Sequence, residues 1–329
     1  PPRQTPSTLH DPSIRGILIR PSSQSFASME KRTILHMFDP MPHNSPFDIN
    51  MAVDAGFDVV VTHNHVQLEE INGLTQDAIF SRGAAGVKRT GLFIGGRDLG
   101  LSLNMLEAAR KAMVPPFQVS VLADPSGAFT TAAALVACVE KALREKHKTE
   151  LQGLRAIVFG GTGPVGIATG VIAALAGVDV TLVDPFNIDT ALDKAKEYNL
   201  RCGTQMRGTY ASSDADKARL LATADIAFCT AKAGIQVLNA SVLGDARQLK
   251  VAGDVNAVPP LGIEGIKLKH FGEPLVHAVN APGAVGVGAL AVGDIKYKLQ
   301  NALLGYLLTA EEPVFLDFTE AFKRARNLV

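Results

Sequence analysis

The sequence predicts an α/β protein made of two α/β domains with a cleft between them. Short apolar runs alternate with longer helical segments along most of the chain, which is typical of parallel sheets covered by helices. The alternation is interrupted by the charged stretch 144–150 and then starts again with a glycine-rich turn. A length of 329 residues is sufficient for two such domains.

The first series of elements precedes the charged stretch. Its expected strands are apolar runs bounded by turn residues, and its expected helices end at glycine or proline. The strands cover residues 33–38, 58–63, 91–95 and 119–123, and the helices cover 47–56, 99–113 and a long segment that follows 124–127 and runs to about 146.

The second series has strands at 156–159, 180–183, 226–229 and 249–252, with helices to about 176 and over 190–198. We expect the strand at 249–252 to end this series. Residues 285–308 are glycine-rich and then helical, and we expect them to return to the first domain. The predicted division is a disordered leader (1–28), a substrate domain (29–148 plus 286–329) and a dinucleotide-binding domain (149–285).

Composition narrows the function classes. Lys plus Arg and Asp plus Glu both number 32, so net charge favours neither nucleic acid nor an anionic membrane as a partner. The uncharged stretch 156–178 contains several glycines and a proline, which favour a buried strand, turn and helix over a membrane span. The widely spaced Cys138, Cys202 and Cys229 indicate a reducing, cytoplasmic compartment. The leader is rich in Pro, Ser and Arg and poor in acids, a composition that weakly resembles an organelle transit segment. We favour a disordered leader, or a start codon placed too early before Met29.

The turn FGGTGPVG is the first candidate site. We expect Gly161 to adopt the turn dihedrals, Gly163 to let a pyrophosphate approach, and Gly166 to let helix and strand pack closely. The helix that follows presents free N–H groups to phosphates. A strand before the turn and a helix after it predict a Rossmann-type dinucleotide site made of Gly161, Thr162, Gly163, Pro164, Val165 and Gly166.

Asp184 ends the next strand, VTLVD, where a ribose hydroxyl would lie. A carboxylate accepts hydrogen bonds from the 2′-hydroxyl and repels a 2′-phosphate, so Asp184 favours NAD over NADP. Alternatively, Pro185 turns the loop so that Asn187 contacts the ribose instead. Thr230 and Ala231, after a later strand, are expected to line the nicotinamide ribose, unless they form an ordinary loop.

Three polar loops are expected to meet at the cleft. The first carries Asp39, Ser45, Asp48 and Asn50; the second spans 124–131; and the third spans 253–262, after a strand's carboxyl end. Helix capping alone would explain Asp124 and Ser126 equally well. A late glycine-rich stretch delivers Lys296, which could equally be a surface lysine.

Metal and hydrolase chemistry lack support in the sequence. His63 and His65 could face one side of an extended segment, but a third ligand does not cluster near them. The HExxH, CxxC and GxSxG motifs are absent from the sequence. We therefore predict no metal cofactor.

The segments ADPSGAFTTAAA, FGGTGPVG, DVNAVPPLGI and GVGALAVGDIKYK, in this order and spacing, resemble the bacterial NAD(P)-dependent methylene-tetrahydromethanopterin dehydrogenases. The resemblance runs from about Thr33 to the end of the chain. DVNAVPPLGI and the terminal GxxKxK pattern (Gly293, Lys296, Lys298) are its most specific parts. Residues 41–50 and 74–82 are most similar to the branch that acts on tetrahydromethanopterin alone.

The resemblance implies hydride transfer from methylene-tetrahydromethanopterin to NAD or NADP, a step that needs no general base. It implies that Asp48, Asp254 and Asn256 hold the pterin or complement the methenyl cation, and that Lys296 orients substrate polar groups. Further expected substrate contacts are Asp124, Thr130, Thr131 and Asn50. Family members oxidise formaldehyde-derived one-carbon units in the cytoplasm as homo-oligomers, as trimers or hexamers. Some branches prefer NADP and carry a basic residue where this chain has Asp184.

Two alternatives remain open. A shikimate or methylene-tetrahydrofolate dehydrogenase would share the architecture but needs a lysine–aspartate or tyrosine–lysine pair in the first domain, whereas the lysine here lies near the carboxyl end. A dinucleotide-sensing binding module would keep the glycine turn without an organised polar cleft.

Overall fold

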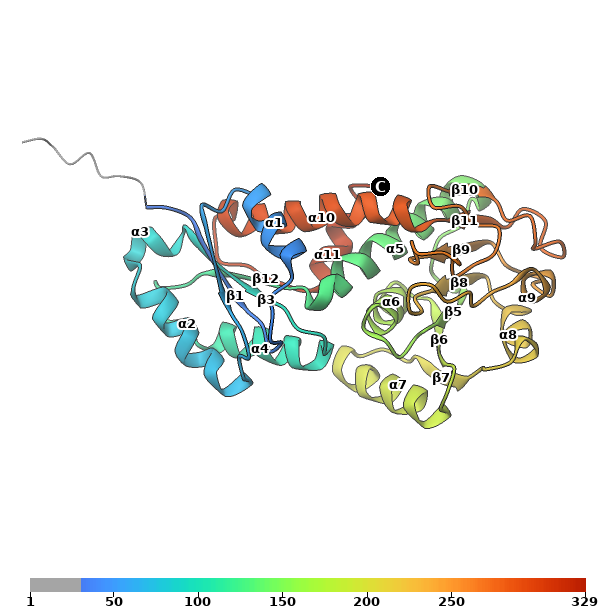
Figure 1. The fold of residues 1–329 in the computed structure, drawn as a ribbon, viewed down its shortest axis with the longest axis horizontal. Helices are drawn as coiled ribbons and strands as arrows, with labels where there is room; N and C mark the ends of the chain where they lie inside the picture. The colour runs from blue at the N-terminus through green and yellow to red at the C-terminus, as the bar shows by residue number, and fades with distance from the viewer. Residues whose placement is uncertain (1–30) are drawn as a thin grey trace, which may run out of the picture. The chain divides into compact units, whose positions relative to one another are not determined.

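The computed structural model describes residues 31–329, so the predicted disordered leader (1–28) lies outside the described residues. The described chain forms two sheets, one of five strands and one of seven, with helices packed against both (Figure 1). Nine of the ten strand pairings among the described residues are parallel. The predicted α/β class is therefore confirmed.

The five-stranded sheet has the order β12-β4-β3-β1-β2. Its strands are β1 (Ile34–Phe38), β2 (Val59–His63), β3 (Thr90–Ile94), β4 (Ser120–Ala123) and β12 (Phe315–Leu316). Every residue of β3 and β4 is buried, as their continuous apolar runs predict for central parallel strands. The helices α1 (Pro46–Asp54) and α4 (Leu99–Lys111) follow β1 and β3, close to their predicted positions.

Four elements were not predicted from the sequence: the helices α2 (Ile71–Phe80), α3 (Gly83–Val87) and α11 (Phe318–Ala325), and the strand β12. The strand β12 has two residues, which is too short for a period-two pattern to be visible. Its pairing with β4 places the end of the chain on the first sheet.

The seven-stranded sheet has the order β10-β11-β9-β8-β5-β6-β7. It contains β5 (Arg155–Phe159), β6 (Asp179–Asp184), β7 (Arg207–Tyr210), β8 (Ile226–Cys229), β9 (Val251–Asp254), β10 (Phe271–Pro274) and β11 (Val285–Val287). The helices α6 (Pro164–Leu175), α7 (Ile188–Cys202), α8 (Asp214–Leu221) and α9 (Ala240–Gly244) connect these strands.

Two expectations about this sheet were wrong. The series does not end with the strand near residue 250, because β11 pairs in parallel with β9 and β10 pairs antiparallel with β11. The expected range 249–252 is also shifted, since β9 covers Val251–Asp254. As a result Gly286 and Val287 belong to the second sheet, beyond the predicted boundary at 285.

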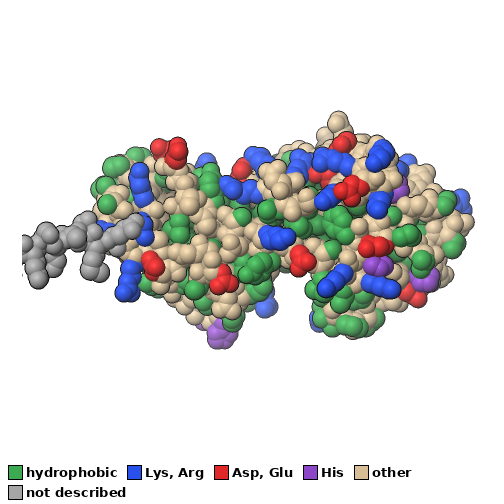
Figure 2. All heavy atoms as spheres, turned by 90° about the horizontal axis from the view of Figure 1, so that it is seen from above, with side chains coloured by type: hydrophobic (Ala, Val, Ile, Leu, Met, Phe, Trp, Pro, Cys, Tyr) green, Lys and Arg blue, Asp and Glu red, His purple; other side chains and the backbone are tan. Residues whose placement is uncertain are grey.

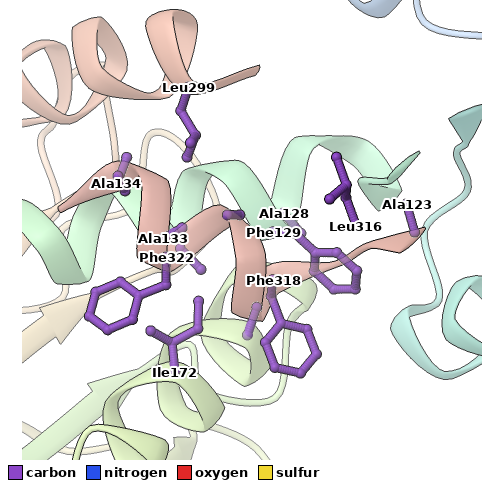
Figure 3. Close-up of a cluster of buried hydrophobic side chains, with 14 of the residues drawn as sticks. Ala123, Ala128, Phe129, Ala133, Ala134, Ile172, Leu299, Leu316, Phe318 and Phe322 are labelled. Atoms are coloured by element: carbon purple, nitrogen blue, oxygen red, sulfur yellow. The ribbon is translucent and has the colours of Figure 1, made fainter. Parts of the chain in front are cut away.

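The helix α5 (Ala128–Ala142) is buried along almost its whole length. Its many alanines let it pack closely against α6, α11 and α10 (Ala289–Thr309). Figure 3 shows side chains of these helices meeting; the rings of Phe129 and Phe318 form an edge-to-face pair with centroids 5.2 Å apart. Because these helices contact both sheets, one apolar cluster extends across the two, and a second cluster packs against the seven-stranded sheet alone.

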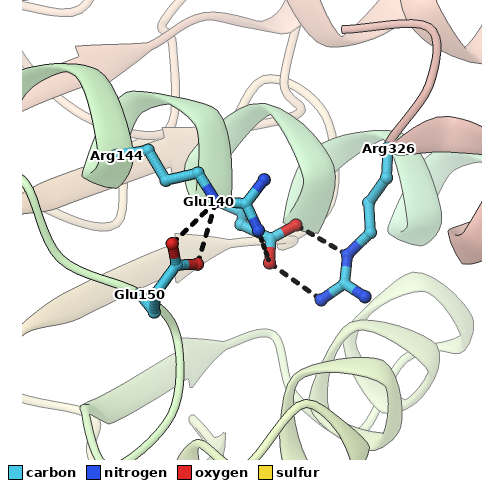
Figure 4. A network of polar contacts seen from close by, with 4 residues as sticks. All are labelled: Glu140, Arg144, Glu150 and Arg326. Carbon is cyan, nitrogen blue, oxygen red and sulfur yellow. Dashed lines mark hydrogen bonds and ion pairs between the residues drawn. The ribbon is translucent and has the colours of Figure 1, made fainter.

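A buried carboxylate anchors the far end of α5 (Figure 4). Glu140 is 2% exposed, and its two oxygens accept hydrogen bonds from Nε and Nη2 of Arg326, at 2.7 and 2.8 Å. Arg144 donates to Glu140 at 3.1 Å and also pairs with Glu150. A carboxylate at this depth needs such partners, because burying it unpaired would be costly. The network ties the carboxyl-terminal segment to the point where the chain leaves α5.

One helical run, Pro125–His147, is long and apolar enough to cross a membrane, and 83% of its most apolar window is buried inside the structure. Core helices meet the same criterion, so this is weak evidence for a span. The stretch 156–178 contains β5, the glycine turn and α6, as predicted. On the face drawn in Figure 2, acidic and basic side chains are interspersed.

Candidate active site

The glycine turn lies between β5 and α6, and four of its glycines are required for different reasons. Gly160 has a φ of +73°, so it carries the left-handed conformation that was expected at Gly161. A Cβ on Gly161 would lie 2.7 Å from the carbonyl oxygen of Val158 and 2.8 Å from the amide nitrogen of Val183. The constraint on Gly161 is thus close approach to the neighbouring strand.

Gly166 packs as its spacing predicted, and the pyrophosphate contact at Gly163 stays a prediction. A Cβ on Gly166 would lie 2.2 Å from the carbonyl oxygen of Gly160, so the helix packs directly on the turn. At Gly163 the nearest atom would be 3.5 Å away, so space is open in front of the backbone. Pro164 is the first helical residue, no side chain caps the helix, and its first-turn N–H groups have no intrahelical partners. These features fit a bound pyrophosphate.

Asp184 ends β6 and is bound to the turn. One carboxylate oxygen accepts a hydrogen bond from the hydroxyl of Thr162 at 2.6 Å, and the other accepts from the backbone N–H groups of Phe186 and Asn187 at 2.8 Å each. Burial raises the pKa of Asp184, but these hydrogen bonds outweigh it and the net pKa is lowered. The carboxylate therefore stays charged and shapes the loop that follows it.

The alternative ribose contact, Asn187, has a different role in the structure. Its side-chain oxygen accepts from the backbone N–H of Asp189 and caps α7. The hydroxyl of Thr230 donates to the carbonyl oxygen of Phe159 at 2.9 Å, while the backbone of Ala231 lies against Gly160. Thr230 and Ala231 therefore adjoin the glycine turn, as a cofactor-binding loop requires.

The third polar loop, residues 253–262, is held in shape by hydrogen bonds of two of its own side chains. Asp254 is 1% exposed and accepts hydrogen bonds from the backbone N–H groups of Asn256 and Ile263, at 2.9 and 3.1 Å. Asn256 accepts from the N–H groups of Gly234 and Val258 and donates to the carbonyl oxygen of Pro260. Both side chains thus hold the loop in shape and tie it to the segment after β8, a geometry that favours a positioning role over direct contact with substrate.

A cluster of charged side chains gathers around Lys296 on α10. Its ammonium nitrogen donates to the side-chain oxygen of Gln300 and lies 3.7 Å from the centroid of the Phe47 ring. Gly127 leaves room for it, since a Cβ there would lie 3.3 Å from Nζ. Burial lowers the pKa of Lys296, while Asp124 and Asp48 act to raise it.

Asp48 lies on α1 and is 6% exposed. Burial raises its pKa to about 6, with a further contribution from the nearby Asp124 carboxylate. A hydrogen bond from Gln300, at 2.6 Å, and the charge of Lys296 act in the opposite direction. Asp48 therefore changes its charge within the physiological pH range.

The remaining predicted substrate residues are distributed unevenly. Asp124 is completely buried; it accepts hydrogen bonds from the backbone N–H groups of Phe129 and Thr130 and from the Thr130 hydroxyl. This is the capping role that was considered for Asp124, combined with a charge directed at Lys296. Thr131 is partly exposed on α5, and Asn50 is exposed on α1. Neither is in the hydrogen-bonded group.

The structure therefore brings Asp48, Asp124 and Lys296 together. Within residues 31–329, neither hydrogen bonds nor ion pairs link Asn256 or Asp254 to this group. Sequence reasoning missed Gln300, Phe47 and Gly160. Gln300 follows Lys296 by four residues on one helix, and Phe47 precedes Asp48, so spacing was the available signal.

Metal ligands do not cluster among the described residues, since no group of three or more His, Cys, Asp or Glu side chains there could hold an ion. His63 contacts His36, with Nε2 of His63 and Nδ1 of His36 3.2 Å apart. Burial lowers the pKa of both. His65 does not join them.

Comparisons with known proteins show the family of this chain. Residues 46–126 match the family model described as methylene-tetrahydromethanopterin dehydrogenase, N-terminal. The chain is 42% identical, over 89% of its own length and 98% of the relative's, to an NAD(P)-dependent methylenetetrahydromethanopterin dehydrogenase of Methylorubrum extorquens. This chain belongs to the methylenetetrahydromethanopterin dehydrogenase family. It is also 31% identical, over 90% of its length and 99% of the relative's, to the bifunctional protein MdtA of the same organism.

Solved structures share the fold at much lower identity. Shikimate 5-dehydrogenase from Listeria monocytogenes is 15% identical with a TM-score of 0.52, covering 89% of this chain and 96% of that one. A 5-ketofructose reductase of Gluconobacter is 15% identical with a TM-score of 0.50, covering 91% and 99%. These likenesses support the Rossmann-type architecture of this family member.

Proposed function

We propose that this chain is an NAD(P)-dependent methylenetetrahydromethanopterin dehydrogenase. It removes a hydride from the methylene carbon of methylene-tetrahydromethanopterin and leaves the methenyl cation. The observation that carries the proposal is the 42% identity across 89% of the chain to a relative of that name. The glycine turn and the Lys296 cluster supply the two parts that such a reaction needs.

The charged cluster suits a substrate that becomes a cation. Asp48 and Asp124 contribute two carboxylates and Lys296 one ammonium, so the group is net negative when both acids are ionised. A negative environment stabilises positive charge that develops on the pterin as the hydride leaves. The bound dinucleotide supplies the hydride acceptor. The step releases no proton, so these residues act through position and charge.

We propose NAD as the preferred form of the cofactor. Asp184 is held at the end of β6 by Thr162 and by the backbone of the following loop, with its pKa lowered. A fixed carboxylate disfavours a 2′-phosphate through like-charge repulsion, and it still has a lone pair for a 2′-hydroxyl.

We also propose that the enzyme works in the cytoplasm, in formaldehyde oxidation, as a homo-oligomer that binds neither nucleic acid nor membrane. The free thiols of Cys138, Cys202 and Cys229 support a reducing compartment. The balanced charge supports the absence of a polyanionic partner.

A shikimate-type or methylene-tetrahydrofolate dehydrogenase is not favoured. The lysine of the candidate site comes from α10, late in the chain, and the two acids near it, Asp48 and Asp124, come from α1 and from the turn between β4 and α5. A dinucleotide-sensing module would not need this buried ionic group, whose assembly costs desolvation energy.

A direct assay tests the function. Purified protein is mixed with methylene-tetrahydromethanopterin and NAD, and the absorbance of the reduced nicotinamide is followed. We expect reduction with this pterin, much slower reduction with methylene-tetrahydrofolate, and a higher kcat/KM with NAD than with NADP. Absence of reduction with the methanopterin substrate would contradict the proposal, and a faster reaction with NADP would contradict only the cofactor preference.

A further inference from the structure

The side chain of Gln300 lies between two ions of the candidate site. It is fully buried on α10, and its amide nitrogen Nε2 donates to Oδ1 of Asp48 at 2.6 Å. Its oxygen Oε1 accepts from Nζ of Lys296 at 2.5 Å. Asp48 and Gln300 are 252 residues apart in sequence, so this contact is made by the fold alone.

The direction of this amide is dictated by charge. An ammonium group can only donate, and a carboxylate can only accept, so the amide oxygen must face Lys296 and the NH₂ group must face Asp48. In the reverse orientation, the amide NH₂ group would face the ammonium group of Lys296 and the amide oxygen would face the carboxylate of Asp48, so neither contact would be a hydrogen bond. Gln300 therefore connects a cation and an anion that form no direct ion pair within residues 31–329.

The side chains around Gln300 leave Lys296 and Asp48 few other hydrogen-bond partners. From α1, the ring of Phe47 covers one side of the ammonium group. From the turn between β4 and α5, the carboxylate of Asp124 accepts hydrogen bonds from Phe129 and Thr130. From the loop after β1, Asp39 adds a third negative charge near Asp48.

We propose that Gln300 is a positioning residue that holds Lys296 and Asp48 apart as separately hydrogen-bonded ions, an inference that rests on the proposed function. A direct lysine–aspartate pair would consume the donors of one and the acceptors of the other. With Gln300 between them, each ion makes one hydrogen bond to the amide. The remaining donors of Lys296 can then face polar atoms of the pterin, and the charge of Asp48 can face the developing cation.

The proposal has a signature in the pH dependence. Burial raises the pKa of Asp48 to about 6, Asp124 and Asp39 also raise it, and the hydrogen bond from Gln300 and the charge of Lys296 lower it. Removing the hydrogen bond therefore raises the pKa of Asp48 further. The acidic limb of the pH–kcat profile moves to higher pH, which a residue that merely fills space would not cause.

The test compares Gln300→Met with the wild type. Methionine has a similar length but cannot hydrogen-bond as the amide does, so we expect kcat to fall roughly 10- to 100-fold, as misplacement of a reacting group allows. The acidic limb should move to higher pH, and the affinity for NAD should be unchanged. Lys298→Met, on the exposed side of the same helix, is the matched control and should keep the wild-type profile.

A second variant and a second readout complete the test. Gln300→Glu keeps the size but places a carboxylate beside Asp48, and it should also shift the acidic limb upward. Carbon NMR titration of the Asp48 carboxyl measures the same shift without turnover. An inactive wild type would overturn the proposed function, while an Asp48 pKa that is unchanged in both folded variants would overturn the role of Gln300.

Discussion

The glycine turn and the Lys296 cluster are built in opposite ways. The turn is made of backbone, within eight consecutive residues, and a single methyl group on Gly166 would meet the carbonyl oxygen of Gly160 at 2.2 Å. The cluster is made of side chains from α1, from the turn between β4 and α5, and from α10, connected by hydrogen bonds and charge. A steric change should therefore disable the glycine turn, whereas a change of charge should disable the Lys296 cluster.

The largest effect is expected at the turn. In Gly166→Ala the new methyl group meets backbone that cannot move alone, so we expect a loss of about 1–3 kcal/mol in the free energy of unfolding, as for overpacked sites. NAD binding should be lost. Chemical denaturation and titration calorimetry measure the two effects.

Gly163→Ala is the matched control at the same turn. Its φ of −79° is open to alanine, and the nearest atom would be 3.5 Å from the new Cβ. We expect its stability to change by less than about 0.5 kcal/mol. Its NAD affinity should still fall, because the methyl group stands where the pyrophosphate approaches. Wild-type NAD affinity in Gly163→Ala would place the phosphate elsewhere.

The next effect concerns charge in the cluster. Asp48→Asn should lower kcat roughly 10- to 100-fold, because it removes a charge that stabilises the developing cation. It should also abolish the acidic limb near pH 6. The substitution keeps the size of the side chain, so a steric loss is not expected. Wild-type kcat at pH 8 in this variant would show that the charge of Asp48 has no part in the reaction.

The same substitution should stabilise the protein at high pH. The pKa of Asp48 is about 6 in the folded chain and about 4 when unfolded, so the stability that this group contributes is present below pH 4 and lost as pH rises through 6. At pH 8 Asp48→Asn should therefore raise the free energy of unfolding by on the order of 1–3 kcal/mol. At pH 4 it should have little effect. Urea denaturation at both values checks this.

The smallest effect is expected at Asp184, a charged side chain that is hydrogen-bonded to the glycine turn. Asp184→Ala should raise the ratio of NADP to NAD efficiency, about tenfold, because it removes like-charge repulsion of a 2′-phosphate. Thr162→Val deletes one hydrogen bond to that carboxylate and should shift NAD affinity by about 1 kcal/mol. Comparison of kcat/KM for both cofactors measures each. An unchanged ratio in Asp184→Ala would remove Asp184 from cofactor selection.

The local sequence predicted the strands and the turn whose formation depends mainly on neighbouring residues. Apolar runs marked β1, β3, β4 and β5, and glycine spacing marked the turn before α6. The strand β7 was missed because its residues, RGTY, are partly exposed and lack an apolar run. Strands β10 and β11 were missed because short, glycine-containing segments become strands only when a neighbour supplies hydrogen bonds.

The candidate site was predicted only in part for the same reason. Sequence motifs indicated Lys296, Asp48 and Asp124 separately, but nothing in them showed that Gln300 would connect the first two. Asp254 and Asn256 were expected at the substrate, and in the structure they hold the loop after β9 in shape and connect it to Gly234. Hydrogen-bond partners distant in sequence are chosen by the packing of helices and have no local signature.

By itself the sequence determined the α/β class, the glycine turn and the acid at the end of β6, because each depends on residues that are close together in the chain, and it determined the family through the order and spacing of four motifs. Only the tertiary structure decided which charges meet. Packing of α10 against α1 and α5 places an amide between Lys296 and Asp48 and holds Asp124 beside them. Burial in that packing raises the pKa of Asp48 to about 6, because a charged group loses its water only when the whole fold surrounds it.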